Sequence, residues 1–451
     1  MPNSDTLLKR QYGLLTAVAI IIGQVIAVGI FLTPAGMARS VGSPFWLLVI
    51  WLMMGGMTLC GALCYAELAA RYPEAGGSYV FLRQAYGSSV AFLYGWMVLL
   101  VLDPGLTAIF SVGLTSYLGH IIAVPEAWRP AIAIAIVVLV AGINIIGAGL
   151  SSSIIKTLTG LKVGFLLFIA GFGFIGGRGD LGNLELFFAI PSDTFRAMAG
   201  GLVGAFFSFA GWWELTRLAG EIREPERNLP RALTLGVIAL TTIYIATCAV
   251  FLYLVQLSGI TSDETFAAQA GEALFGAAGG KIFAAIVVFS VLGSLVAYFM
   301  VSPRVYYAMA KDGVFFDSVA RVHPRFGTPA RAIAIQALLA VALILTGSFQ
   351  QIISVFFFVV VFFIAMTVAG LFIIRRKEFT GYGTPFFPIT PIVFLVITVV
   401  VLFFIAMQDP TRSLTGVVIV LIGIPVYYFV FRRRGKANGM DQDYSVERSK
   451  G

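Results

Sequence analysis

Long apolar stretches alternate along this chain with shorter polar connections. A helix needs about 20 apolar residues, at about 1.5 Å each, to cross the hydrocarbon of a bilayer. Twelve stretches meet this condition, so we expect an all-α, polytopic membrane protein with 12 transmembrane helices. The expected spans are 13–38, 44–71, 88–119, 131–149, 152–176, 198–220, 231–257, 280–308, 331–347, 351–374, 388–407 and 413–431.

The spans fall into two sets of five, followed by a final pair. We expect a cytoplasmic N-terminal segment at 1–12, helices 1–5 at 13–176 and helices 6–10 at 198–374. Helices 11 and 12 follow at 388–431, and the polar segment 432–451 is expected to be a cytoplasmic tail. The two sets correspond in hydropathy, while their sequences show no convincing identity.

The first span, Leu14 to Ala38, is interrupted by Gly23 and Gly29. Glycine lacks a Cβ and lowers the cost of leaving the helical conformation, so we expect the helix to break around Ala27 to Gly29. An unwound turn within a membrane is tolerated only where protein surrounds it and its backbone groups bind something. The alternative is that the glycines only allow close packing of helices.

A second interrupted span, 200–220, supports the first interpretation. Interrupted spans at corresponding positions of two halves indicate a transport site near the middle of the membrane. The positive N-terminal end of one half-helix suits a carboxylate, and the free carbonyl groups of the other suit an ammonium group. The two breaks therefore predict a site for an amino acid.

Composition agrees with a membrane protein, because 59% of the residues are hydrophobic and 12% are charged, whereas soluble domains carry about 25% charged residues. The net charge of +8 does not indicate a nucleic-acid partner here. With both termini inside, 23 of the 30 basic residues fall on the cytoplasmic side and six on the other. This asymmetry predicts a multi-pass protein of the cell inner (plasma) membrane with both termini cytoplasmic.

Other features exclude several kinds of chemistry. Cys60, Cys64 and Cys248 lie within spans, so none is placed for a disulfide outside the membrane. No phosphate-binding loop and no cluster of metal-ligating side chains occurs in the sequence. We therefore expect no enzyme activity, no catalytic residue, no cofactor and no metal.

The first span lacks a cleavage site and is expected to be retained.

Charged residues inside spans are costly and suggest function. Lys162 lies within the fifth span, where it could face the break of the first helix and take the place of a sodium ion. It could instead extend toward the membrane surface.

Asp103 and Glu214 are the other two candidates. Asp103 precedes Pro104 in the third span and could serve as a proton site, a side-chain site or half of an ion pair. Glu214 stands three residues before Arg217, a spacing that favours a structural ion pair on one helix face over a proton site.

Several runs of sequence resemble one transporter family. The run GQVIAVGIF at 23–31 resembles the first-helix motif of the amino acid–polyamine–organocation (APC) superfamily, commonly GxIIGSGIF. FSFAGW at 207–212 and EIREPERNLPR at 221–231 resemble its sixth helix and exit loop, especially in the L-type amino acid transporter branch. YPEAGGSY at 72–79 and the run 292–313 also fit.

This resemblance implies the fold of the leucine transporter, a 5+5 inverted repeat with broken helices 1 and 6 and alternating access. It implies a carboxylate held by the amides of Val28 and Gly29 and an aromatic gate at Phe207, and Lys162 matches the lysine of sodium-independent members. The ammonium group is expected at the carbonyls of Val25, Phe207 and Ala210. The expected substrate-binding set is Val25, Ala27, Val28, Gly29, Phe207, Ser208 and Ala210.

Departures from the motif bear on the substrate. Ala27 replaces glycine and Val28 replaces serine, and their methyl groups, together with Trp213, narrow the site. We expect sodium-independent exchange or proton-coupled transport of small neutral L-amino acids such as alanine, serine and glycine. The first alternative is a proton-coupled carrier of cationic amino acids or polyamines that uses Asp103 or Glu214. An amino-acid sensor or a channel is the alternative of another class.

Partners follow from the same resemblance. The extracellular cysteine by which heavy-chain-linked members are joined to their partner is missing between spans three and four. We therefore expect no disulfide-linked heavy chain, and a monomer in the lipid bilayer is sufficient for alternating access.

Overall fold

The computed structural model describes residues 8–27, 29–176, 179–184, 188, 193–257, 260, 265–347, 349–377 and 380–431. Helices form almost all the regular structure of this part, and its one isolated β-bridge joins Tyr12 to Ile222. The expected tail 432–451 and most of the expected N-terminal segment 1–12 lie outside the described residues.

Nine helical stretches in the described part are long and apolar enough to cross a membrane. The broken spans α1–α2 and α9–η5 and the shorter helix α14 bring the number of spans to the expected 12. The expected all-α, polytopic fold with broken first and sixth helices is confirmed, while the division of the chain at the expected domain bounds stays a prediction. The first half contains α1 (Leu14–Val25), α2 (Gly29–Val41), α3 (Pro44–Arg71), α4 (Ser78–Tyr86), α5 (Ser88–Met97), the π-helix η2 (Val98–Leu102), α6 (Asp103–Gly119), α7 (Arg129–Ile146) and α8 (Ala148–Ile175).

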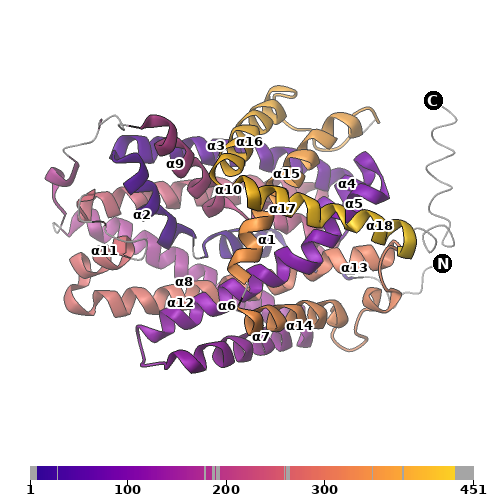
Figure 1. Ribbon diagram of the computed structural model, residues 1–451, viewed down its shortest axis with the longest axis horizontal. Helices are drawn as coiled ribbons and strands as arrows, with labels where there is room; N and C mark the ends of the chain where they lie inside the picture. The colour runs from indigo at the N-terminus through magenta and orange to yellow at the C-terminus, as the bar shows by residue number, and fades with distance from the viewer. Residues whose placement is uncertain are drawn as a thin grey trace.

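The rest of the chain begins with another interrupted helix and ends with the pair of spans expected after the two sets of five. It contains α9 (Thr194–Phe209), the 3₁₀ helix η5 (Trp212–Glu221), α10 (Pro225–Leu254), α11 (Thr265–Phe275), α12 (Gly279–Val301), α13 (Pro303–Lys311), α14 (Ala330–Thr346), α15 (Phe349–Ile374), α16 (Ile389–Gln408), α17 (Pro410–Leu421) and α18 (Gly423–Val426). Most long helices run along the longest axis of the molecule (Figure 1). The half-helices α2 and α9 pack together at one end, and α13 and α18 lie at the other (Figure 1).

Burial separates the central helices from the peripheral ones. In the stretches 88–119 and 279–311, 67% of the most apolar window is buried, whereas only 22–33% is buried in 126–146, 149–175 and 410–431. Apolar residues on the outer faces of these three stretches therefore suit contact with lipid.

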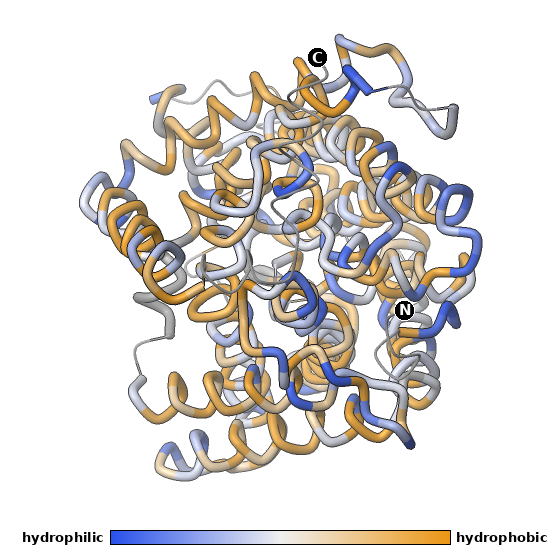
Figure 2. The backbone as a smooth tube through the Cα atoms, turned by 90° about the vertical axis from the view of Figure 1, so that its right-hand side faces the viewer, coloured by the Kyte–Doolittle hydropathy of each residue, from blue (hydrophilic) through white to orange (hydrophobic). Residues whose placement is uncertain are grey.

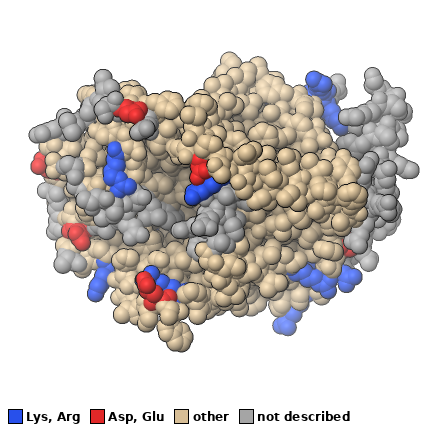
Figure 3. All heavy atoms as spheres, in the orientation of Figure 1, with Lys and Arg blue, Asp and Glu red and all other residues tan. Residues whose placement is uncertain are grey.

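Polar residues concentrate at the ends of the molecule. Figure 2 looks onto the end that holds α13 and α18, and hydrophilic residues occupy its loops while hydrophobic residues line the helices. On the face drawn in Figure 3, the larger groups of basic side chains lie at this same end. The connection between α3 and α5 contains the helix α4, and α11 lies in the connection between α10 and α12.

Candidate functional site

The first helix breaks where the glycine pattern predicts. Helix α1 ends at Val25, the residues Ile26 and Ala27 leave the helical path, and α2 begins at Gly29. Val28 lies outside the described residues. The end of α1 therefore offers carbonyl groups and the start of α2 offers amide groups at one place.

Lys162 of α8 reaches this break. Its ammonium nitrogen Nζ lies 2.8 Å from the carbonyl oxygens of Gly23 and Ile26 and 2.9 Å from that of Ser290. The hydroxyl oxygen Oγ of Ser294 is a fourth neighbour at 3.1 Å. Lys162 is only 3% exposed, so a buried cation joins the broken helix to α8 and α12.

The two serines of α12 bind the same carbonyl groups. Ser290 donates to the Ile26 carbonyl at 3.0 Å, and Ser294 donates to the Gly23 carbonyl at 2.7 Å. The Gly23 and Ile26 carbonyls released by the break are thus satisfied inside the protein, as a membrane requires. No feature of the sequence marked these two serines, because hydroxyl groups are common in apolar spans.

The second break follows α9. Gly211 has a φ of +108°, a left-handed conformation that favours glycine, and the chain continues as the 3₁₀ helix η5. The Ala210 amide donates to the Phe207 carbonyl at 3.2 Å, and the Glu214 amide donates to the Gly211 carbonyl at 3.1 Å. Glycine at this position therefore allows the change from an α-helix to a tighter one.

The two breaks lie against each other. A Cβ on Gly29 would approach the Cα of Ser208 to 3.0 Å, so a side chain larger than hydrogen would strain this contact. The hydroxyl groups of Thr33 and Ser208 form a short contact between α2 and α9. Tyr244 of α10, which the sequence analysis missed, places its hydroxyl oxygen 3.1 Å from the Val25 carbonyl and 3.0 Å from the Ser208 carbonyl.

The expected site residues differ in how far they are buried around this junction. Val25, Ala27, Gly29 and Ser208 are buried, and Ala210 is half-buried. Phe207 is 39% exposed, and its ring centroid lies 5.9 Å from that of Phe357. A recess of about 540 Å³ lies beside α2 and α9, lined by Thr33, Gly36, Met37, Arg39, Ser40, Gly200 and Gly204.

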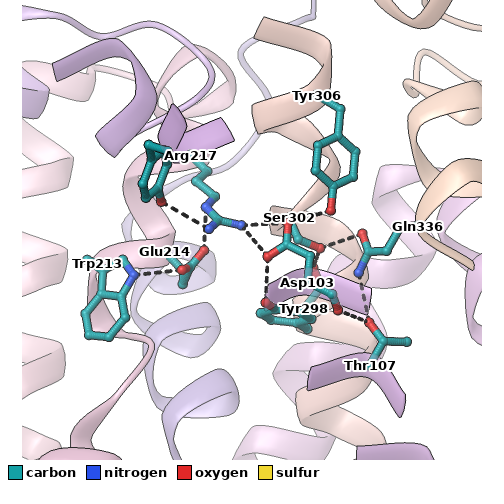
Figure 4. A network of polar contacts seen from close by, with 10 residues as sticks. Asp103, Thr107, Trp213, Glu214, Arg217, Tyr298, Ser302, Tyr306 and Gln336 are labelled. Carbon is teal, nitrogen blue, oxygen red and sulfur yellow. Dashed lines mark hydrogen bonds and ion pairs between the residues drawn. The ribbon is translucent and has the colours of Figure 1, made fainter. Parts of the chain in front are cut away.

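Asp103 belongs to a separate buried network (Figure 4). Its carboxylate accepts hydrogen bonds from the Arg217 guanidinium at 3.0 and 3.1 Å and from the hydroxyl groups of Tyr298 and Tyr306, each at 2.7 Å. Nη2 of Arg217 donates a hydrogen bond to the hydroxyl oxygen of Tyr94 at 3.2 Å. The carboxylate of Asp103 is thus fully occupied by protein donors.

Glu214 shares the same guanidinium (Figure 4). Its Oε2 lies 2.5 Å from Nε of Arg217, although the two atoms are not aligned for a hydrogen bond. Its Oε1 accepts a hydrogen bond from the Trp213 indole at 2.7 Å. Two carboxyl groups, Asp103 and Glu214, therefore surround one cation, and a protonated Glu214 would remove the excess negative charge.

The end that holds α13 is closed by a second buried ion pair. Arg304 donates to Glu221 at 2.8 Å, and their side chains are 2% and 0% exposed. The backbone amides of Gln11 and Tyr12 donate to the Glu221 carbonyl at 2.8 and 3.0 Å. The segment before α1 is therefore fastened to the end of η5, close to the ion pair.

Among the described residues no group of side chains could hold a metal ion.

Comparison with known proteins gives a consistent picture. Residues 12–426 match the model of the family described as amino acid permease. The chain is 30% identical to the serine/threonine exchanger SteT of Bacillus subtilis, over 96% of this chain and all of that protein. It is 28% identical to the Asc-type amino acid transporter 1 of Mus musculus, over 93% of this chain and 81% of that protein. It is 27% identical to the large neutral amino acids transporter small subunit 2 of Homo sapiens, over 93% of this chain and 80% of that protein.

Proposed function

This chain belongs to the amino acid permease family, within the APC superfamily, and we propose that it is a sodium-independent carrier of small neutral L-amino acids such as alanine, serine and glycine. As a member of that family it is a multi-pass membrane transporter. The observation that carries the proposal is the junction of the two helix breaks, where Lys162 is bound to the carbonyl groups of the first break.

The two breaks can hold both charged groups of an amino acid. The start of α2 presents the amide of Gly29 to a carboxylate, which the positive end of the helix dipole stabilises. The proposal adds the amide of Val28, which lies outside the described residues, as the second donor to this carboxylate. The ammonium group binds the carbonyl oxygens of Val25, Phe207 and Ala210. The Phe207 oxygen accepts one hydrogen bond, from the Ala210 amide, and its second lone pair can accept the ammonium group. The Val25 oxygen already accepts from the Tyr244 hydroxyl and the Ala27 amide, so the ammonium group would replace one of these two donors.

Lys162 takes the place of a coupling sodium ion in this proposal. Four oxygen atoms surround its ammonium group at 2.8–3.1 Å, and all of them lie on α12 or at the first break. A lysine that extends to the membrane surface would be solvated instead, so the geometry opposes that alternative.

A neutral substrate side chain agrees with the state of Asp103. Its carboxylate already accepts four hydrogen bonds from Arg217, Tyr298 and Tyr306, so it has no free position for a cationic side chain. The methyl group of Ala27 and the buried ring of Trp213 reduce the room for larger side chains.

Glu214 supports proton coupling as a second candidate, beside exchange. It shares Arg217 with Asp103 inside the protein, and a proton on Glu214 would balance the charge of the network. Binding and release of this proton during the transport cycle would couple transport to a proton gradient.

Alternating access follows from the two unlike ends of the molecule. The Glu221–Arg304 ion pair closes the end that holds α13, while the recess beside α2 and α9 lies toward the other end. Phe207 would close over the ligand as the gate on that side. A ligand shifts the two states only if it binds them with different affinity, so both gates must respond to the same bound amino acid.

Orientation and partners complete the proposal. The basic end that holds α13 faces the cytoplasm, so both termini are cytoplasmic in the inner (plasma) membrane. All three cysteines lie in helices that are expected to span the membrane, which supports function without a disulfide-linked heavy chain. A single copy carries both breaks, and a monomer is sufficient.

The test is uptake of labelled alanine into sodium-free proteoliposomes. Uptake that requires internal amino acid indicates exchange, and uptake into empty vesicles that rises with an inward proton gradient indicates proton coupling. Arginine uptake without alanine uptake would support the cationic carrier. Ligand binding without uptake would indicate a sensor, and current without a counter-substrate would indicate a channel.

A further inference from the structure

Gln24, directly before the first break, is a buried amide without a hydrogen-bond partner in the part of the chain that the structure describes. It lies in the last turn of α1 and is 4% exposed. Neither its Oε1 nor its Nε2 has a hydrogen-bond partner among the described residues. A buried amide that makes no hydrogen bond is costly, and such groups in proteins commonly have a reason to be retained.

The side chain of Gln24 lies on the side of α1 that faces the second break. Gly23, its neighbour, faces α8, where a Cβ would overlap the hydroxyl group of Thr159. By contrast, a Cβ on Gly211 would lie 3.8 Å from Cγ of Gln24 and 3.6 Å from Cγ2 of Val25. Gln24 therefore lies between the two breaks, next to the carbonyl groups expected to hold the substrate ammonium.

The three polar candidates that the sequence singled out are already engaged. The ammonium group of Lys162 binds four oxygen atoms, the carboxylate of Asp103 accepts four hydrogen bonds, and Glu214 contacts Trp213 and Arg217. The amide of Gln24 differs from them, because it still offers both an acceptor and two donors.

We infer that the carboxamide of Gln24 binds the side-chain hydroxyl group of the substrate and makes this carrier prefer hydroxyl-bearing small amino acids over apolar ones of the same shape. A hydroxyl group donates one hydrogen bond and accepts others, so it can pair with Oε1 and Nε2. An apolar side chain would leave the amide unpaired, and a site built to bind a hydroxyl group discriminates against such a ligand. The inference deepens the proposed function and rests on it.

The size of the preference follows from a single hydrogen bond. One net hydrogen bond changes affinity by a factor of about 2 to 12. Threonine and valine have nearly the same shape and differ in one hydroxyl group, so their ratio of inhibition constants isolates this contact. We expect threonine to compete with labelled alanine about tenfold better than valine does.

The test compares this ratio in Gln24→Leu and in the control Asn144→Leu, in sodium-free proteoliposomes. Asn144 is also a buried amide, but it donates to the carbonyls of Val140 and Val296 at 3.0 and 3.4 Å. Gln24→Leu should bring the threonine/valine ratio to about one without lowering the melting temperature in detergent, because no hydrogen bond within the protein is lost. Asn144→Leu should lower the melting temperature and leave the ratio unchanged.

Several results would overturn the inference. An unchanged ratio in Gln24→Leu would do so, and so would a loss of melting temperature as large as that of Asn144→Leu. If Gln24→Leu is not recovered as folded protein, Gln24→Asn serves instead, because its shorter amide should also lower the ratio. Wild-type protein without any alanine uptake would refute the proposed function itself, whereas alanine uptake with equal competition by threonine and valine would refute only this inference.

Discussion

Replacing Lys162 by alanine should remove transport while the protein still folds. The substitution deletes the ammonium group that joins α8 and α12 to the carbonyls of Gly23 and Ile26. The first break would then keep its serine contacts and lose its buried cation. The helix ends proposed to hold the amino acid would no longer be fixed in the geometry that binds it.

The expected loss of binding follows from two hydrogen bonds of Lys162. A hydrogen bond to a charged group contributes about 1.5–3 kcal/mol, so the two bonds to Gly23 and Ile26 contribute about 3–6 kcal/mol. Ser290 and Ser294 still bind these carbonyls, so the lower end applies. A loss of about 3 kcal/mol lowers the population competent to bind about a hundredfold. Stability against unfolding should fall less, because removing a buried charge also removes its desolvation cost.

The assay is initial uptake of labelled alanine into sodium-free proteoliposomes, together with alanine binding and melting temperature in detergent. Lys156→Ala is the matched control, since Lys156 lies on the same helix with its side chain exposed. We expect uptake and binding to fall about a hundredfold in Lys162→Ala and to stay at the wild-type level in Lys156→Ala. Uptake within about twofold of wild type in Lys162→Ala would refute the role assigned to this residue.

Three further substitutions test other parts of the account. Phe207→Ala should weaken alanine binding and uptake at least about tenfold, because a ring that closes over the ligand contributes more than about 1.5 kcal/mol. Normal alanine binding and uptake in this variant would exclude Phe207 as the gate. Gly29→Ala should lower the stability of the protein by about 1–3 kcal/mol, because the added methyl group overlaps the backbone of α9. The melting temperature should fall and alanine binding should be lost. An unchanged melting temperature would contradict the close contact. Glu221→Gln leaves Arg304 buried and unpaired, which costs about 3–5 kcal/mol in the closed state. Access to the site can be followed with Val25→Cys as the only cysteine of the protein. This cysteine should react faster with a polar maleimide when Glu221→Gln is also present than when Glu221 is intact. An equal rate in the two proteins would argue against the ion pair as a gate.

The sequence predicted the helices and their breaks well because both depend on local properties. Apolar length determines which stretches cross a bilayer, and Gly211, with its left-handed conformation, allows the chain to leave the helix at the second break. Gly29 begins α2, where its missing Cβ permits the close approach of Ser208. Lys162 could also be singled out, because a charge in an apolar span is rare whatever its partner.

Partners across the fold could not be predicted in the same way. The hydroxyl groups of Tyr298 and Tyr306 that bind Asp103 come from residues about 200 positions away, and nothing in an apolar span distinguishes them from packing tyrosines. Tyr244 was missed for the same reason. The bridge between Tyr12 and Ile222 depends on packing of the whole bundle, which no local pattern encodes. Gln24 had a partial signal as a polar residue in the first-helix motif, but only the structure shows that no described residue pairs with its amide.

The central claim is that the two helix breaks bind both charged groups of a small amino acid. Calorimetric titration of the purified protein in sodium-free buffer with alanine, alaninamide and propionate tests it directly. Alaninamide lacks the carboxylate and propionate lacks the ammonium group, so alanine should bind and neither analogue should bind measurably. Binding of alaninamide or propionate as tight as that of alanine would contradict the account.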